Sequence, residues 1–125
     1  MPCDYAIDVE RGLVRTRLWG SVTQGDVLDL RERMTVDPAF SPRLSILIDM
    51  REVERLTLTT ADVQALARTS TLGQGARRAV VACSPSSFGV ARMFQSYREL
   101  NEGLEETAVF ETMEAAEAWL TTPPV

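Results

Sequence analysis

The chain has 125 residues, a length that fits one domain. Its 18 acidic and 13 basic side chains give a net charge of -5, which argues against a nucleic-acid surface because such a surface needs a positive field. It contains no histidine, which removes Ser-His and Cys-His nucleophile pairs and most catalytic zinc sites. No apolar run is as long as a membrane span and the N-terminus has no signal-peptide pattern, so we expect a cytoplasmic protein without a membrane partner. Because histidine chemistry is excluded, we also expect a non-enzymatic protein without cofactor or metal.

The first third of the chain predicts a hairpin followed by a helix. Residues 5–9 and 13–19 read as strands, and Gly12 lies in the short turn between them. Thr23 is a good N-cap for a helix that ends before Pro38. The face of this helix that we expect to be buried carries Val27, Leu30, Arg31 and Met34.

Two compact apolar runs, residues 44–49 and 79–83, predict strands buried on both faces, as in a central parallel sheet. After the first run we expect a loop over residues 50–58 and a helix capped by Thr59 or Thr60. After the second we expect a helix that starts in the serine cluster 84–87 and reaches about residue 101.

The C-terminal part predicts a short strand over residues 107–110, a helix over 113–120 and a frayed tail over 121–125. The order β-β-α-β-α-β-α-β-α predicts a single α/β domain over residues 1–125. It would hold a five-stranded mixed sheet in sequential order, with an antiparallel hairpin at the N-terminal edge and four helices.

With its opening hairpin, the run Met50-Arg51-Glu52-Val53 and the stretch Phe88-Gly89-Val90-Ala91-Arg92-Met93-Phe94, the chain resembles the SpoIIAA-like (STAS-like) family over nearly its whole length. The resemblance implies a βα superhelix and a bacterial protein with a regulatory role. It implies little about activity, because many members of the family are uncharacterised.

In anti-sigma factor antagonists of that superfamily, an Asp-Ser-Ser-Gly-type motif at the start of the second helix carries a phosphorylated serine. The matching place here reads Leu58-Thr59-Thr60-Ala61-Asp62, with threonines for both serines and no glycine. Thr59 and Thr60 are therefore candidate phosphate acceptors at a helix N-terminus, with helix capping as the alternative role.

The expected N-terminus of the third helix offers a second candidate site. Ser84, Ser86 and Ser87 would lie where free backbone N–H groups bind an anion, with Arg77, Arg78 or Arg92 as charged neighbours. The alternative is simple capping beside solvated arginines.

Phe88 is a candidate partner contact on that helix. The expected apolar stripe runs through Val90, Met93, Phe94, Tyr97, Leu100 and Leu104, and Phe88 falls off it, on the side of Arg92. An aromatic side chain off the core stripe suggests a partner surface, and the alternative is that Phe88 folds back as a staple. We expect the charged residues Arg98, Glu99 and Glu102 to form a solvated face.

The remaining reactive side chains predict structure rather than chemistry. Cys83 lacks the arginine spacing of a phosphatase loop, so we expect a buried thiol that packs as a small hydrophobe. Asp49, Arg51, Glu52 and Glu54 predict a salt-bridged loop, because the chain supplies no histidine or metal spacing to go with the carboxylates.

Two functions follow from these patterns. The first is a regulatory interaction domain, expected as a homodimer, that contacts an unknown protein through Ser84, Ser86, Ser87, Phe88 and Arg92. The second is a carrier of a small apolar or anionic molecule, with its pocket at the carboxyl ends of the strands. A pocket of a few hundred Å³ beside residues 84–88 would favour the carrier.

Overall fold

The structure is a computed structural model that describes residues 2–101 and 105–122, and within them the elements follow the predicted order. The strands are β1 (Cys3–Asp8), β2 (Leu13–Thr23), β3 (Ser45–Thr57), β4 (Arg77–Val81) and β5 (Glu106–Phe110). The helices are α1 (Gln24–Thr35), α2 (Thr60–Ala67), α3 (Pro85–Leu100) and α4 (Met113–Thr121). Part of the tail predicted over 121–125 lies outside the described residues, and α4 extends through Thr121.

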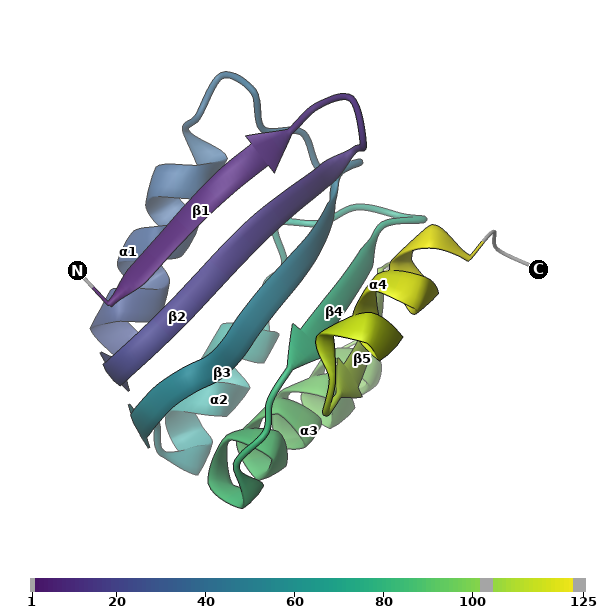
Figure 1. Cartoon of the computed structure of the whole chain (residues 1–125). Helices are drawn as coiled ribbons and strands as arrows, with labels where there is room; N and C mark the ends of the chain where they lie inside the picture. The colour runs from purple at the N-terminus through teal and green to yellow at the C-terminus, as the bar shows by residue number, and fades with distance from the viewer. Residues whose placement is uncertain (1, 102–104, 123–125) are drawn as a thin grey trace.

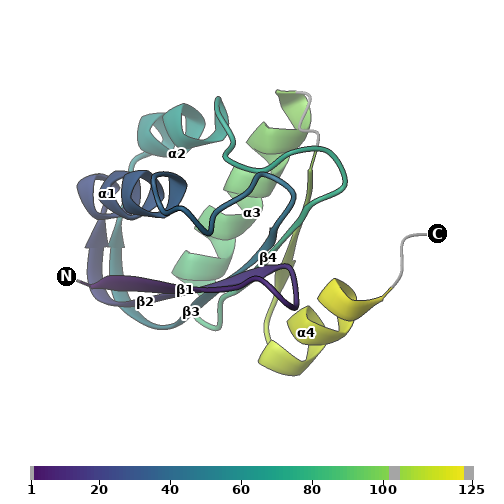
Figure 2. The ribbon, with the colours of Figure 1, turned by 90° about the horizontal axis from the view of Figure 1, so that it is seen from above.

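The five strands form one sheet in the order β1-β2-β3-β4-β5. β1 is antiparallel to β2 and the other pairs are parallel, which confirms the predicted mixed sheet with its edge hairpin. Three helices, α1, α2 and α3, cover one face of the sheet, and α4 lies on the other face against β4 and β5 (Figures 1 and 2). Among the described residues, no helix is both long and apolar enough to cross a membrane.

β2 and β3 are much longer than the strands beside them, with 11 and 13 residues against five in β4 and in β5. The prediction of a loop over residues 50–58 is therefore wrong: β3 continues to Thr57 because it stays paired with β2 as far as Thr23. The register shifts on either side of Gly20, whose φ of 66° suits a residue without a side chain. Such irregularities increase strand twist, and here they lie in the part of β2 and β3 that extends past β4.

α4 covers β4 and β5 on the face of the sheet opposite α1, α2 and α3. Leu47, 2 % exposed, packs there with Val81 and Ala116, and the ring of Trp119 lies 5.6 Å from that of Phe110. Arg77 fixes the end of this helix, because its Nη1 donates to the carbonyl of Trp119 at 2.6 Å and its guanidinium lies over the Trp119 ring. β4 is therefore covered on both sides, which explains why all of its residues after Arg77 are buried.

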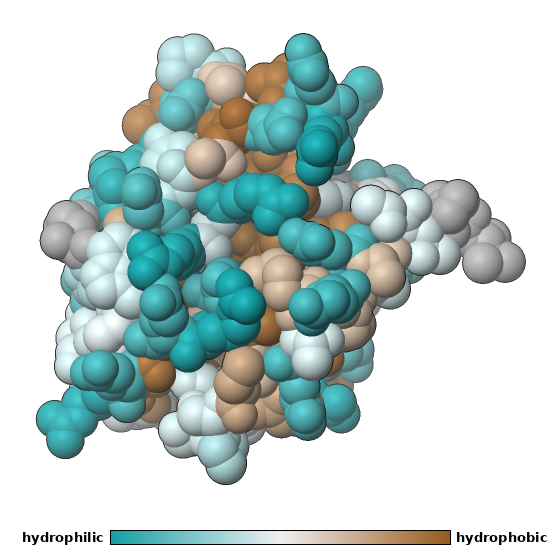
Figure 3. Space-filling model, in the orientation of Figure 1, coloured by the Kyte–Doolittle hydropathy of each residue, from teal (hydrophilic) through white to brown (hydrophobic). Residues whose placement is uncertain are grey.

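None of the described helices covers the same face at β1, β2 and the part of β3 beyond Leu47, and this face is mostly hydrophilic (Figure 3). Ion pairs join its side chains: Arg15 with Glu117 at 3.3 Å, Arg51 with Asp49 at 3.0 Å, and Arg17 with Glu52. The Arg17 guanidinium also lies over the ring of Trp19. Asp49, Arg51 and Glu52 are thus ion-paired, as predicted, but on a strand rather than in a loop.

Candidate functional site

The serines predicted as an anion site cap α3. The hydroxyl of Ser84 accepts a hydrogen bond from the backbone N–H of Ser87 at 3.2 Å, and Ser87 itself is only 2 % exposed. Ser86 and Arg92 are exposed, and Phe88 is half-buried. Arg77 and Arg78 open β4, whereas Ser84 follows its other end, so these two arginines lie away from the serine cluster.

Thr59 and Thr60 begin α2. The Thr59 hydroxyl accepts from the backbone N–H of Asp62 at 3.1 Å, and the Asp62 carboxylate accepts from the backbone N–H of Thr59 at 2.9 Å. This reciprocal pair is a capping box, which satisfies two N–H groups at the helix start. Thr60 is exposed. A phosphate on either threonine would meet the negative charge of Asp62.

The prediction that Cys83 is buried is wrong. Cys83 follows the last residue of β4 and is exposed, and its thiol donates to the carbonyl of Glu111 at 3.4 Å. Cys3 is the buried cysteine, in the cluster that includes Leu18 and Val22. The described residues contain no group of three metal-binding side chains of the histidine, cysteine, aspartate or glutamate type.

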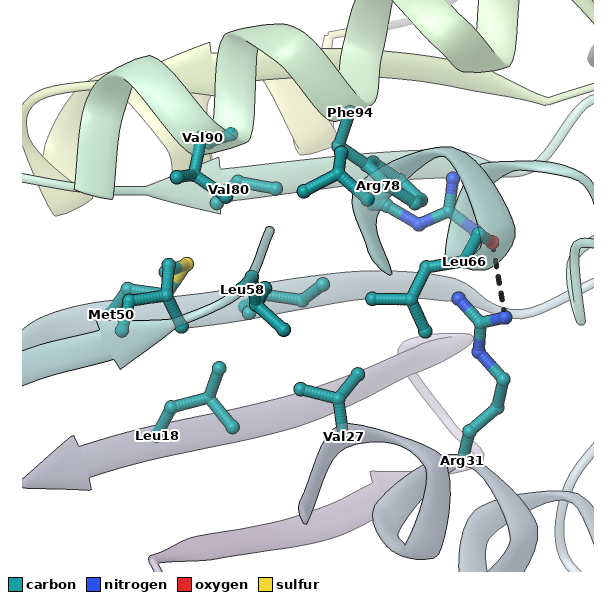
Figure 4. A pocket seen from close by; sticks show the side chains of 14 residues that line it. Leu18, Val27, Arg31, Met50, Leu58, Leu66, Arg78, Val80, Val90 and Phe94 are labelled. Atoms are coloured by element: carbon teal, nitrogen blue, oxygen red, sulfur yellow. Dashed lines mark hydrogen bonds between the residues drawn. The ribbon is translucent and has the colours of Figure 1, made fainter. Parts of the chain in front are cut away.

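An apolar pocket of about 120 Å³ lies between the sheet and the helices α1, α2 and α3 (Figure 4). Its sheet wall is made by apolar side chains of β2, β3 and β4, namely Leu18, Ile48, Met50 and Val80. The helices contribute Val27, Val63, Leu66, Val90, Ala91 and Phe94, and Leu56 and Leu58 close the side where β3 runs into α2. Of the residues that the sequence analysis considered for a site, Arg78 lines it, whereas the serines of the α3 cap, Phe88, Arg92, Thr59 and Thr60 do not.

The length of β3 helps to form the pocket. Met50 and Leu56 lie in the segment that was expected to be a loop, and as strand residues they extend the sheet wall under α2. α3 approaches the sheet through small side chains, Ser87 and Ala91, which are both buried. Large side chains would have closed the space that remains between α3 and α1.

Two arginines are the polar members of this lining. Figure 4 shows the guanidinium groups of Arg31 and Arg78 at one end, beside Leu66, with Leu18, Met50, Val80 and Val90 at the other. Arg31, from α1, donates from Nη1 to the carbonyl of Leu66 at 3.2 Å. The pocket is therefore amphipathic, with a hydrocarbon end and a cationic end.

Arg78 is 4 % exposed, which is unusual for a charged side chain. Its Nη1 donates to the hydroxyl of Thr107 and its Nη2 to the hydroxyl of Ser70, both at 3.0 Å, and its guanidinium lies over the ring of Phe94. Burial lowers the pKa of Arg78 to about 10, although the charge of Glu105 opposes this. Burial likewise lowers the pKa of Arg31, and the charge of Arg98 adds to that effect.

Arg98 is also buried, so its assignment to a solvated face is wrong. Its Nε donates to Glu105 at 3.0 Å and its Nη1 to the carbonyl of Ala67 at 2.7 Å, and the Glu105 side chain is fully enclosed. The other oxygen of Glu105 accepts from Ser70 at 2.7 Å. The sequence analysis grouped Arg98 with Glu99 and Glu102, its neighbours along the chain, whereas its partner in the structure is Glu105, directly before β5.

The expected stripe of α3 is wrong at Leu100, which is 77 % exposed. Its members Val90, Met93, Phe94 and Tyr97 are half-buried, and the most deeply buried residues of α3 are Ser87, Ala91 and Arg98. Leu104 and Glu102, which were also assigned to this helix, lie outside the described residues.

Comparison with known proteins places the fold. The chain is similar to the crystal structure of an uncharacterized protein of the DUF3478 family with a SpoIIAA-like fold from Shewanella loihica PV-4. The TM-score is 0.62 at 18 % sequence identity, over 94 % of this chain and 93 % of that one. No protein-family model matches the chain, and no curated protein matches it. The chain thus has the SpoIIAA-like fold, as the sequence resemblance implied.

Proposed function

We propose that this chain is a non-catalytic binding domain that holds a small apolar molecule in the pocket between α1, α2 and α3. The observation that carries the proposal is the lining itself, in which 12 of 14 side chains are apolar. Ligand sites in proteins combine such walls with a few placed polar groups, and the two arginines are those groups here. This is the carrier predicted from the sequence, with its pocket over the sheet face rather than beside residues 84–88.

The chemistry of the lining supports binding rather than turnover. Hydrocarbon side chains neither donate nor accept protons, and arginine stays protonated at neutral pH, even at the lowered pKa of Arg78. A pocket of about 120 Å³ is close in size to a cavity of roughly 150 Å³ that holds a benzene ring.

A cavity-filling variant tests the proposal. Val90 lies on α3 and lines the pocket, so Val90→Phe should weaken the binding of 1-octanol at least about tenfold, because the new ring occupies the ligand's space. Binding is measured from methyl chemical shifts of the lining leucine and valine side chains during titration with 1-octanol.

The matched control is Met93→Phe, at a half-buried position three residues along the same helix that is not part of the lining. It should keep the affinity of the parent protein. If the parent protein shows no saturable shifts with 1-octanol, or if Val90→Phe binds it as well as the parent does, the proposal is wrong.

A protein-interaction role is the second candidate, and the accessibility of the start of α3 favours it. Arg92 and Ser86 are exposed there, and Phe88 is half-buried. Phe88→Ala should weaken capture of a partner from host extract, relative to the parent protein, with a change in unfolding free energy below about 1 kcal/mol. A loss of about 3 kcal/mol or more would assign Phe88 to the core instead.

A further inference from the structure

The cationic end of the pocket points to the chemistry of its occupant. Resting on the binding function proposed above, we propose that the ligand is a small apolar monocarboxylic acid whose carboxylate lies between Arg31 and Arg78 while its hydrocarbon part fills the apolar end. An apolar pocket alone would accept any small hydrocarbon, so the inference depends on what surrounds the two guanidinium groups.

A second cavity, of about 80 Å³, adjoins the pocket at these arginines. The two share Leu18, Val27, Ile48, Arg31 and Arg78 as lining residues. The side chains of Arg31 and Arg78 therefore border both spaces. This gives room for a head group beside the arginines without displacing the apolar side chains.

Thr16 provides an independent observation in the second cavity. Its side chain is 3 % exposed and lines that cavity, and its hydroxyl oxygen has no hydrogen-bond partner among the described residues. A buried hydroxyl without a partner is costly, and proteins keep such groups where something else completes the bond. A carboxylate beside Arg31 and Arg78 supplies the acceptor that the Thr16 hydroxyl lacks.

The charges around this space are unbalanced among the described residues. The charges of Arg31 and Arg98 add to the effect of burial in lowering the pKa of Arg78, the charge of Arg98 does the same for Arg31, and Glu105 is the carboxylate that opposes this effect at Arg78. Glu105 is already occupied by Arg98 and Ser70. No described carboxylate lies within 4 Å of Arg31 or Arg78.

Arg31 also has donors to spare. Its hydrogen bonds to the Leu66 carbonyl and the Thr69 hydroxyl both come from Nη1, whereas a guanidinium offers five N–H groups. The two oxygens of a carboxylate match that planar fork. One ring, or a chain of about six to eight carbons, suits the pocket together with the adjoining cavity, because roughly 150 Å³ holds benzene.

The test compares sodium octanoate with 1-octanol, which has the same chain length and no charge, by calorimetry and methyl chemical shifts. Octanoate should bind the parent protein at least about tenfold more tightly than 1-octanol. Arg31→Gln should weaken octanoate about tenfold or more and leave 1-octanol within about twofold.

The control is Arg33→Gln, two residues along α1, where the arginine pairs with Asp29 at 3.0 Å outside both cavities. It should leave both affinities unchanged. Thr16→Val, which keeps the shape of the side chain and removes the hydroxyl, should weaken octanoate alone, and it serves as the second variant if Arg31→Gln folds poorly.

The outcomes separate the two proposals. Equal binding of octanoate and 1-octanol, or equal losses for both in Arg31→Gln, would overturn the carboxylate site and leave the apolar pocket standing. Saturable binding of neither compound would overturn both.

Discussion

Replacing Glu105 by glutamine should lower the free energy of unfolding by about 3–5 kcal/mol. The carboxylate is fully enclosed and accepts from Arg98 at 3.0 Å and from Ser70 at 2.7 Å. Glutamine keeps the shape but leaves the positive charge of Arg98 buried without its counter-charge. Urea denaturation at pH 7, followed by circular dichroism, measures the loss.

Glu106→Gln is the matched control for this experiment. Glu106 is the next residue along the chain, is exposed, and approaches Arg77 only to 3.7 Å. Its replacement should change the unfolding free energy by less than about 0.5 kcal/mol. A loss below about 1 kcal/mol for Glu105→Gln would show that Arg98 has another means of charge compensation.

The difference between the parent protein and Glu105→Gln should also depend on pH. Burial raises the pKa of Glu105, but the hydrogen bonds from Ser70 and Arg98 and the charges of Arg78 and Arg98 outweigh it and hold the pKa below its usual value. A lowered pKa gives stability that is present above the unfolded value of about 4.3 and is lost as the pH falls through the folded value. The stability gap should therefore narrow below about pH 4.3.

Arg78→Met should have the opposite effect and raise the free energy of unfolding by about 1–2 kcal/mol. The drop of the Arg78 pKa from its usual value to about 10 corresponds to a cost on the order of 3 kcal/mol for burying its charge, present at every pH below about 10. Methionine fills a similar volume without charge. It gives up the bonds to Thr107 and Ser70, worth about 1 kcal/mol each, which is why the gain is smaller than the cost removed.

The same variant should lose octanoate binding at least about tenfold, because one of the two guanidinium groups is gone. A protein that becomes more stable as it loses affinity would show that Arg78 serves the ligand rather than the fold. Arg78→Lys is the control, since it keeps the buried charge and should gain no stability. If Arg78→Met is less stable than the parent, the guanidinium is a structural cation.

Elements with a clear hydrophobic period were predictable from the sequence, and contacts between distant elements were not. The Thr23 and Thr59 caps and the two buried runs at 44–49 and 79–83 follow local rules that a single sequence displays. The sequence analysis ended β3 too early because the charged residues Arg51, Glu52 and Glu54 are typical of a loop. These side chains are exposed on a strand that pairing with β2 extends.

The pocket illustrates the same limit. Its lining comes from six helices and strands and the connection between β3 and α2, so no short sequence motif predicts it. One signal was available: Arg31 falls on the apolar stripe of its helix, between Val27 and Met34, where a charge is out of place. Arg78, at the start of a buried strand, is the second such residue, whereas Arg98 and Glu105 needed the tertiary structure to be paired.

The placement of the two tryptophans has a practical consequence. Trp119 belongs to α4 and packs against Phe110 of β5, and Trp19 lies with Arg17 on the side of the sheet that faces away from α1, α2 and α3. Both indoles are thus screened from the pocket by the strands themselves. Intrinsic tryptophan fluorescence should therefore stay almost constant while a ligand enters the pocket, and this signal would not report binding. A fluorescent probe for binding has to be attached on the side of the sheet that carries α1, α2 and α3.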